Sequence, residues 1–106
     1  MQKMIKRKPT SPGEILYEEF LLPLGITQKE LATHIGCDYK VINRLINEKT
    51  RITTDMALKL AFSFETTPDF WLNAQIALDL WNSSKKRYKT SSLIRKHRRR
   101  NRLKVN

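Results

Sequence analysis

Residues 28–45 read QKELATHIGCDYKVINRL, and the spacing within this stretch decides the fold class. Counted from Gln28, the fifth residue is Ala32 and the ninth is Gly36, and apolar residues occupy five further offsets: Leu31, Ile35, Cys37, Ile42 and Leu45. A small fifth residue lets two helices approach closely, and glycine at the ninth position permits a tight turn between them. Seven matches at fixed offsets therefore predict a helix-turn-helix.

Capping signals on either side of this stretch predict further helices. A hydroxyl or carboxylate followed by proline or a glutamate marks a helix start, and apolar residues at helical spacing follow each such signal. The first expected helix runs from Ser11 to Pro23, which should stop it. The next three run from Thr27 to Gly36, from Asp38 to about Asn47, and from Thr53 or Thr54 to Phe64. The last is started by Thr67-Pro68-Asp69 and runs from Phe70 to about Asn82. β-Branched residues never alternate with polar ones for long enough to predict a sheet. The sequence predicts an all-α, compact five-helix body.

The positive charge is confined to the end of the chain. Residues 1–84 contain ten Lys or Arg and ten Asp or Glu, whereas residues 85–106 contain eleven Lys or Arg and no acid, which is the entire net charge of +11. We therefore divide the chain into an N-terminal arm (1–10), a helix-turn-helix domain (11–84) and a basic tail (85–106). Such a tail, helical or coiled, suits a polyanion: DNA, RNA, an acidic protein or an anionic membrane face.

Length and composition exclude several classes of protein. A chain of 106 residues with one cysteine holds one small domain and no internal disulfide framework. No apolar run approaches the roughly 20 residues that span a bilayer, and no secretory signal is recognisable, so we expect no membrane association and a cytoplasmic location. His34, Cys37 and His97 have no spacing that suggests metal ligands or a catalytic pair. We expect no enzyme activity, no metal and no cofactor.

The helix predicted after Asp38 leaves hydrogen-bonding side chains facing outward. Arginine and lysine suit guanine edges in the major groove and asparagine suits adenine, so the expected base-reading residues are Tyr39, Lys40, Asn43 and Arg44. Residues at the start of the preceding helix and just after this one are placed to bind phosphates: Thr27, Gln28, Lys29, Asn47, Lys49, Thr50 and Arg51. The alternatives are a solvated polar face, and for Thr27 simple helix capping.

The last predicted helix carries more large apolar groups than one packing face requires. A second face could be covered by a two-fold related copy, which makes the expected dimer interface Phe70, Trp71, Ile76, Leu80 and Trp81. The alternative is that all of them belong to the core.

Three segments together resemble a known family: SPGEILYEEFLLPLGITQKELATHIGC, INRLINEKTRIT and MALKLAFSFETTPDFWLNAQIALDLW. They are similar to the HigA/VapI antitoxins, within the Cro/cI-type helix-turn-helix superfamily, over about Thr10–Trp81. The resemblance implies a compact five-helix dimer that binds operator DNA. It also implies pairing with a RelE-like HigB ribonuclease toxin and repression of its own operon. The basic tail has no counterpart in the family pattern.

Two other functions stay open at this point. A stand-alone helix-turn-helix repressor without a toxin partner would have the same sequence features, and the gene upstream would distinguish the two. An RNA-binding protein driven by the tail would need exposed stacking aromatics, and Tyr88 is the only aromatic residue of the tail.

Overall fold

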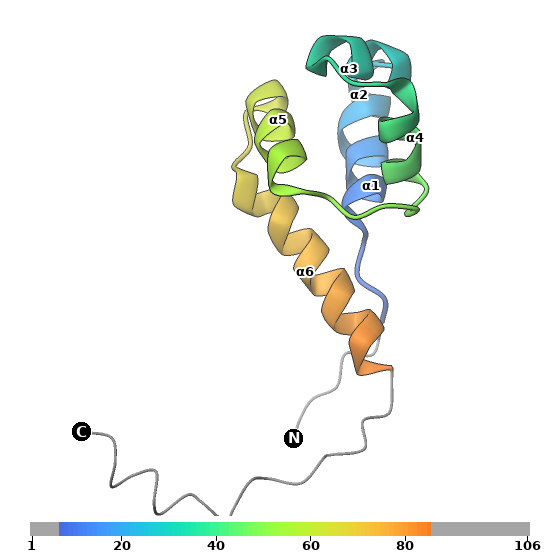
Figure 1. Ribbon diagram of the computed structural model, residues 1–106, viewed down its shortest axis with the longest axis vertical. Coiled ribbons are helices and arrows are strands. Elements are labelled where there is room, and N and C mark those ends of the chain that lie inside the picture. Colours follow the sequence, from blue (N-terminus) through green and yellow to red (C-terminus); the bar gives the residue numbers. More distant parts are fainter. Residues whose placement is uncertain (1–6, 86–106) are drawn as a thin grey trace, which may run out of the picture.

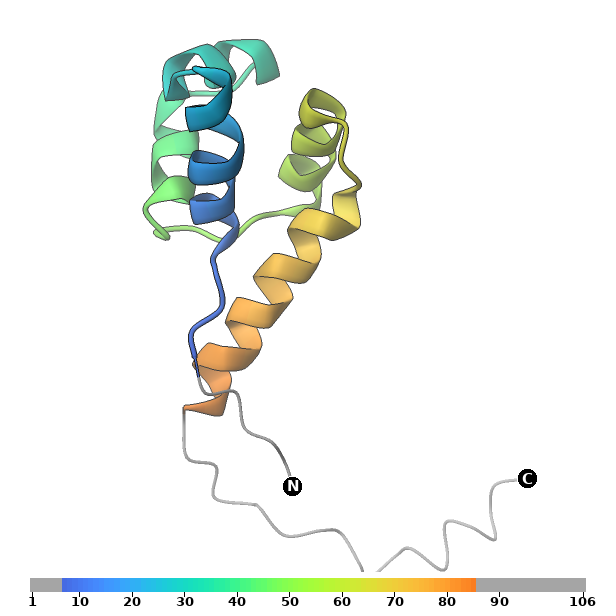
Figure 2. The same ribbon diagram turned by 180° about the vertical axis from the view of Figure 1, so that it is seen from behind.

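The computed structural model describes residues 7–85, and these form five helical runs. The first run comprises α1 (Pro12–Ile15), the π-helical stretch η1 (Leu16–Leu21) and α2 (Leu22–Leu24). The others are α3 (Gln28–Ile35), α4 (Tyr39–Ile46), α5 (Thr54–Phe64) and α6 (Pro68–Ser84). Within the described residues there is no strand, so the predicted all-α, five-helix architecture is confirmed (Figures 1 and 2).

Each predicted N-cap is made by the expected side chain. Thr27 Oγ1 accepts from the Glu30 backbone N–H at 3.0 Å and Glu30 Oε1 accepts from the Thr27 N–H at 2.9 Å, which completes a capping box. Asp38 accepts from the Lys40 N–H at 2.8 Å, and Ser11, Thr53 and Thr67 cap α1, α5 and α6 in the same way. Such caps stabilise a helix by about 1 kcal/mol each. Their agreement with the sequence explains why most helix starts could be predicted.

The expected stop at Pro23 is wrong. The first run continues through Pro23 to Leu24, and Gly25, in the left-handed region at φ 68°, ends it. A proline inside an α-helix lacks an N–H and clashes with the carbonyl one turn earlier. Here the preceding turn is π-helical, and the Leu22 N–H bonds to the Tyr17 oxygen, five residues back. This wider turn moves the carbonyls out of register with an α-helix, so the chain passes through Pro23 without ending the helix.

The core lies where the first run, α4, α5 and α6 meet. Its fully buried large side chains include Leu16, Ile42, Leu60 and Trp71. Trp71 also donates a hydrogen bond from Nε1 to Thr66 Oγ1 at 2.7 Å, which satisfies its only polar atom. Of the five apolar helix-turn-helix positions, three are buried and two, Ile35 and Cys37, are half-buried against the same cluster. Burial raises the pKa of the Cys37 thiol, as expected of a packed cysteine.

The predicted segments at the two ends of the chain have a different status. The arm is described only from Arg7, and of the basic tail only Lys85 is described. The question of a helical or coiled tail therefore lies outside the described residues.

Candidate nucleic-acid interface

The turn between α3 and α4 has the geometry that the sequence predicts. Gly36 adopts a left-handed conformation at φ 86°, and the N–H groups of Gly36 and Cys37 both bond to the Ala32 oxygen, at 2.8 and 2.9 Å. Ala32 is itself buried. A side chain at position 36 would be strained in this conformation, and a larger one at position 32 would separate the helices. The helix-turn-helix is thus built by its two small residues.

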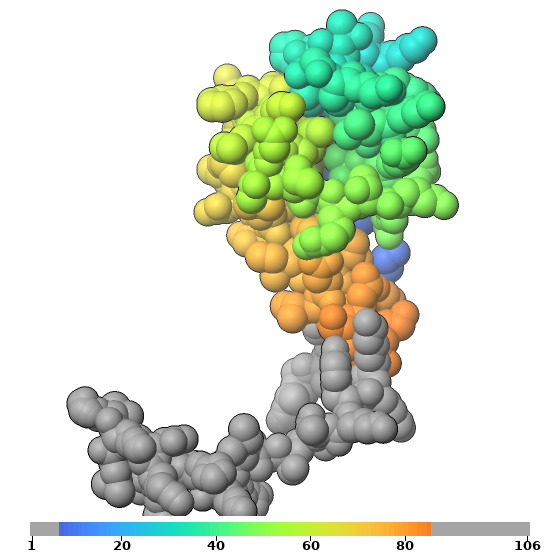
Figure 3. Space-filling view, viewed as in Figure 1, coloured from blue at the N-terminus to red at the C-terminus, as the bar shows by residue number. Residues whose placement is uncertain are grey.

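The outward face of α4 carries the four residues expected to read bases. Tyr39, Lys40 and Arg44 are exposed, and Asn43 is half-buried. In Figure 3 α4 lies on the side of the molecule away from α5. Asp38 is the one acid beside these residues, and its carboxylate is engaged as the cap of α4. The exposed face is therefore dominated by hydrogen-bond donors.

Three hydrogen bonds link Asn43, an expected base reader, to two expected phosphate binders, Gln28 and Asn47. Asn43 Nδ2 donates to Gln28 Oε1 at 3.0 Å, across the space between α4 and α3. Asn47 Nδ2 in turn donates to the Asn43 backbone oxygen at 2.9 Å and to Asn43 Oδ1 at 3.3 Å. Gln28, Asn43 and Asn47 thus form one polar chain. Sequence spacing could place the three residues near each other but could not give their pairing.

At the start of α3, Lys29 is exposed and Gln28 is half-buried. The Thr27 hydroxyl accepts the Glu30 N–H, so its capping role is made, while its own hydrogen remains available to an oxygen acceptor. The helix start and Lys29 favour an anion at this end of the interface, and the Glu30 carboxylate in the same turn offsets part of that charge.

The loop after α4 holds the remaining phosphate candidates. Lys49, Thr50 and Arg51 are exposed there, beside Glu48, which takes a left-handed conformation at φ 58°. Lys8 of the N-terminal arm forms an ion pair with Glu48, with 2.9 Å between Nζ and Oε1. This hydrogen bond and the charge of Lys8 hold the pKa of the Glu48 carboxyl below its usual value. Sequence reasoning missed both residues, because nothing in the sequence connects two positions so far apart.

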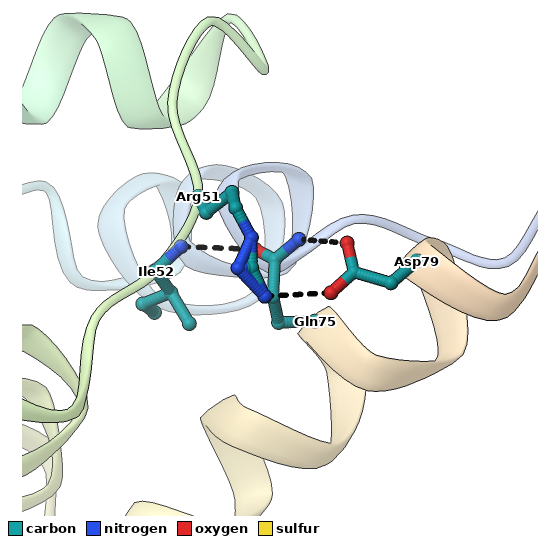
Figure 4. A network of polar contacts seen from close by, with 4 residues as sticks. All are labelled: Arg51, Ile52, Gln75 and Asp79. Atoms are coloured by element: carbon teal, nitrogen blue, oxygen red, sulfur yellow. Dashed lines mark hydrogen bonds and ion pairs between the residues drawn. The ribbon is translucent and has the colours of Figure 1, made fainter. Parts of the chain in front are cut away.

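Arg51 has a partner within the chain. Its Nη2 lies 2.6 Å from Asp79 Oδ2 on α6, although its side chain stays 61% exposed (Figure 4). Asp79 Oδ1 accepts from Gln75 Nε2 at 2.9 Å, and Gln75 Oε1 accepts the Ile52 N–H at 2.9 Å. Gln75 is buried, so this network satisfies a polar side chain and fastens the loop to α6. An Arg51 contact with phosphate would have to share the guanidinium with Asp79.

Gly13 lets the backbones of α1 and α4 approach each other closely. A Cβ placed on Gly13 would lie 2.0 Å from the Leu45 backbone oxygen and 2.7 Å from the Ile46 Cα. Only glycine allows this approach of two backbones. The sequence suggested Gly13 only as part of a capping signal, and the contact could not be foreseen from local pattern.

The expected dimer residues of α6 divide into two groups. Trp71 is fully buried within the chain, so its assignment to a dimer interface is corrected to the core. Ile76 and Leu80 are exposed, Phe70 is 40% exposed, and Trp81 is half-buried with the Lys85 ammonium 4.2 Å from its ring centroid. On the neighbouring α5, Phe62 is 84% exposed, an apolar surface residue that the sequence did not single out.

The described residues offer little for other chemistry. In residues 7–85 no three His, Cys, Asp or Glu side chains are grouped so that they could hold a metal ion. In the same part of the chain, no helix has the length and hydropathy needed to cross a membrane.

Comparisons with known proteins agree with this geometry. The helix-turn-helix family profile matches residues 18–71. An uncharacterised HTH-type transcriptional regulator of Haemophilus influenzae is 49% identical over 79 residues, 74% of each chain. Antitoxin HigA-1 of Vibrio cholerae is 47% identical over 78 residues, covering 74% of this chain and 73% of its own. Among solved structures, the Pseudomonas aeruginosa antitoxin HigA with the higBA promoter aligns with a TM-score of 0.72 at 31% identity, over 81% of this chain and 99% of that one.

The fold and the interface therefore define a DNA-binding regulator of the helix-turn-helix class rather than an enzyme. The chain belongs to the helix-turn-helix family, in the group that includes the HigA antitoxins and virulence-associated protein I. The resemblance to the HigA/VapI family is confirmed.

Proposed function

We propose that this chain is a dimeric, sequence-specific antitoxin of the HigBA type, which acts in the cytoplasm. It binds its own operator through α4 and represses its operon, and it neutralises a RelE-like ribonuclease toxin. The observation that carries the DNA-binding part is the open face of Tyr39, Lys40, Asn43 and Arg44 on a helix held by a helix-turn-helix turn. The solved HigA relative with the higBA promoter, which aligns over 81% of this chain, supports DNA binding by this fold.

Base reading and phosphate binding divide between the two ends of this interface. Tyr39, Lys40, Asn43 and Arg44 would enter the major groove and carry the sequence preference. The start of α3, with Thr27, Gln28 and Lys29, would bind phosphates of one DNA strand. The loop with Asn47, Lys49, Thr50 and Arg51 would bind phosphates of the other strand. These contacts would fix the position of the chain on the duplex without reading its sequence.

The exposed apolar residues of α6 support dimerisation. Ile76 and Leu80 lie one helical turn apart, and Phe70 and Trp81 extend the same helix at either end. Ile76 and Leu80 form an exposed apolar pair that a partner helix could bury. A two-fold dimer would place two recognition helices about 34 Å apart, which suits a pseudo-palindromic operator.

The experiment has two separate parts. Footprinting of the full chain on the DNA upstream of its own gene should show protection of two half-sites one helical turn apart. Co-expression with the product of the adjacent gene should relieve growth arrest and give a co-purifying complex. Absence of a protected site would contradict operator binding, and a protected site without any toxic neighbour would contradict the antitoxin role.

A protected site without a toxic neighbour is the result expected of the other candidate function, a stand-alone repressor without a toxin partner. The Haemophilus influenzae relative, named a transcriptional regulator, favours it. The interface on α4 serves both functions equally.

A further inference from the structure

Charge is unevenly distributed over the folded body. The helix-turn-helix and the loop after it carry charges of both signs: the cations Lys29, Lys40, Arg44, Lys49 and Arg51, and the carboxylates Glu30, Asp38 and Glu48. Five exposed carboxylates lie on the first helical run and around the turn between α5 and α6, and in residues 7–85 none of them forms an ion pair: Glu14, Glu18, Glu19, Glu65 and Asp69. The first helical run and the turn between α5 and α6, which we call the acidic side, thus carry carboxylates and no Lys or Arg.

A groove lies on the acidic side, between the end of the first helical run, α3 and the C-terminal end of α5. It consists of two adjoining hollows of about 340 and 450 Å³ that share Ser63 and Phe64. Figure 2 shows the first run and α5 side by side at this position. Phe20, Leu24 and Phe64 supply an apolar floor. The titratable side chains of the lining are the carboxylates Glu19, Glu30 and Glu65 and the imidazole of His34. We call this feature the acidic groove.

The lining of the acidic groove specifies the chemistry of an occupant. Leu24 is 59% exposed, so the groove has apolar surface still to bury. Carboxylates repel nucleic acid and favour Lys or Arg. An occupant must therefore be a cationic peptide segment with apolar side chains among its charges.

We propose that this occupant is the chain's own basic tail, residues 86–106. The tail carries ten Lys or Arg, since Lys85 is the eleventh of residues 85–106, and it has no acid. Tyr88, Leu93, Ile94, Leu103 and Val105 provide apolar anchors between these charges. Charge complementarity and the alternation of apolar and cationic residues thus match the tail to the groove.

The tail is also long enough. To return from Lys85 to the groove it must span at most the lengths of α6 and α5, which at 1.5 Å per residue are about 25 and 16 Å for 17 and 11 residues. Twenty-one extended residues reach about 70 Å. Because the tail is tethered, its effective concentration at the groove is of millimolar order, so weak contacts suffice to hold it there.

Docking of the tail has a consequence for its availability. Exposed ion pairs are weakened by salt, since the Debye length falls to about 8 Å at 0.15 M. A tail held in the acidic groove is withheld from DNA phosphates, and higher salt releases it. The inference does not depend on the operator or on a toxin.

A spin label tests the proposal in the full-length chain. A nitroxide is attached to the thiol introduced by Asn106→Cys in a Cys37→Ser background, and amide signals are recorded by NMR. At 50 mM salt we expect broadening at Ser63, Phe64 and Glu65, and its loss at 500 mM salt. Absence of broadening at the groove at low salt would overturn the proposal.

Matched variants separate docking from general attraction. Glu19→Gln with Glu65→Gln removes two groove carboxylates and should abolish the broadening. Glu14→Gln with Asp69→Asn removes the same charge away from the groove lining and should preserve it. Broadening that survives the first pair of substitutions contradicts docking in the groove. In a mixture of spin-labelled chains and ¹⁵N chains without the label, equally strong broadening of the ¹⁵N chains contradicts docking of the tail on its own chain. Unchanged amide spectra elsewhere confirm that each variant is folded.

Discussion

The side-chain amide of Asn43 donates a hydrogen bond to Gln28 Oε1, 3.0 Å away, and so fixes a side chain expected to read bases against one expected to bind phosphate. The bond holds Asn43 in one rotamer before DNA arrives. A side chain that is already ordered loses less conformational entropy when it binds DNA. Removal of the hydrogen bond would leave Gln28 without the contact that orients it. The two residues should therefore act as a unit.

A double-mutant cycle on this pair measures the coupling free energy between Asn43 and Gln28. We expect Asn43→Ala and Gln28→Ala each to weaken operator binding, and the double variant to lose less than the sum, with a coupling of about 0.5–3 kcal/mol. Lys29→Ala, which removes a neighbouring charge outside this pair, should combine additively with Asn43→Ala. Affinities from fluorescence anisotropy would decide, and strict additivity of the Asn43 and Gln28 effects would show that the hydrogen bond has no role in DNA binding.

Arg44 should determine one base pair of the operator. Its side chain is exposed on α4, and a bidentate contact with guanine contributes about 1–3 kcal/mol of discrimination. Arg44→Ala should relax preference at one position per half-site, as measured by binding to singly substituted operators. Arg51→Ala is the control, since its guanidinium pairs with Asp79 and should affect all sequences alike. An unchanged sequence preference in the Arg44 variant would remove Arg44 from the reading residues.

Leu80→Glu should dissociate the proposed dimer. A carboxylate placed in an apolar interface must be desolvated without a partner, which costs several kcal/mol. Leu80 is 57% exposed in one chain and Leu22, in α2, is 58% exposed, so Leu22→Glu introduces the same charge at equal exposure away from α6. Light scattering at micromolar concentration should report a monomer for the first variant and a dimer for the second. A Leu80→Glu variant that stays dimeric places the interface elsewhere.

Gly13→Ala should destabilise the fold. The added methyl meets the Leu45 backbone oxygen at 2.0 Å, so α1 must move from α4, and overpacking of this kind costs about 1–3 kcal/mol. Elsewhere in a helix the same change stabilises by about 0.5–1 kcal/mol. Chemical denaturation gives the free energy of unfolding, with Glu14→Ala, one residue on and exposed, as control. A stability equal to or above that of the parent chain would contradict the contact.

The Lys8–Glu48 pair should make stability depend on pH. Since Lys8 lowers the pKa of Glu48 in the folded chain, its contribution is present at neutral pH and is lost as the pH falls through that lowered value. Lys8→Met should reduce stability at pH 7 and leave it nearly unchanged at acid pH. Arg7→Met removes an adjacent charge with no such partner among the described residues and should show no comparable pH dependence. Equal losses for Lys8→Met at both pH values would contradict the assignment.

The sequence predicted those features that are local. N-caps, the turn at Gly36 and the apolar positions of the helix-turn-helix depend on a few neighbouring residues, and the structure has them as expected. Pro23 was misjudged because its effect depends on the register of the preceding turn, which a π-helical stretch changes.

What the sequence could not provide is the set of long-range contacts. Gly13 against Leu45, Lys8 with Glu48, and Arg51 with Asp79 each join residues that only the tertiary fold brings together. Trp71 was placed at an interface because an apolar helix reads alike whether a core or a partner covers each side chain, and only the packing of α5 and α6 distinguishes them.

The backbone contact at Gly13 separates two properties of α4. Its inner side is held to α1 through main-chain atoms, which are the same for every amino acid. Tyr39, Lys40 and Arg44 point outward and take no part in that contact. If these three side chains read bases as proposed, their replacement should change operator preference while the contact between α1 and α4 stays as it is.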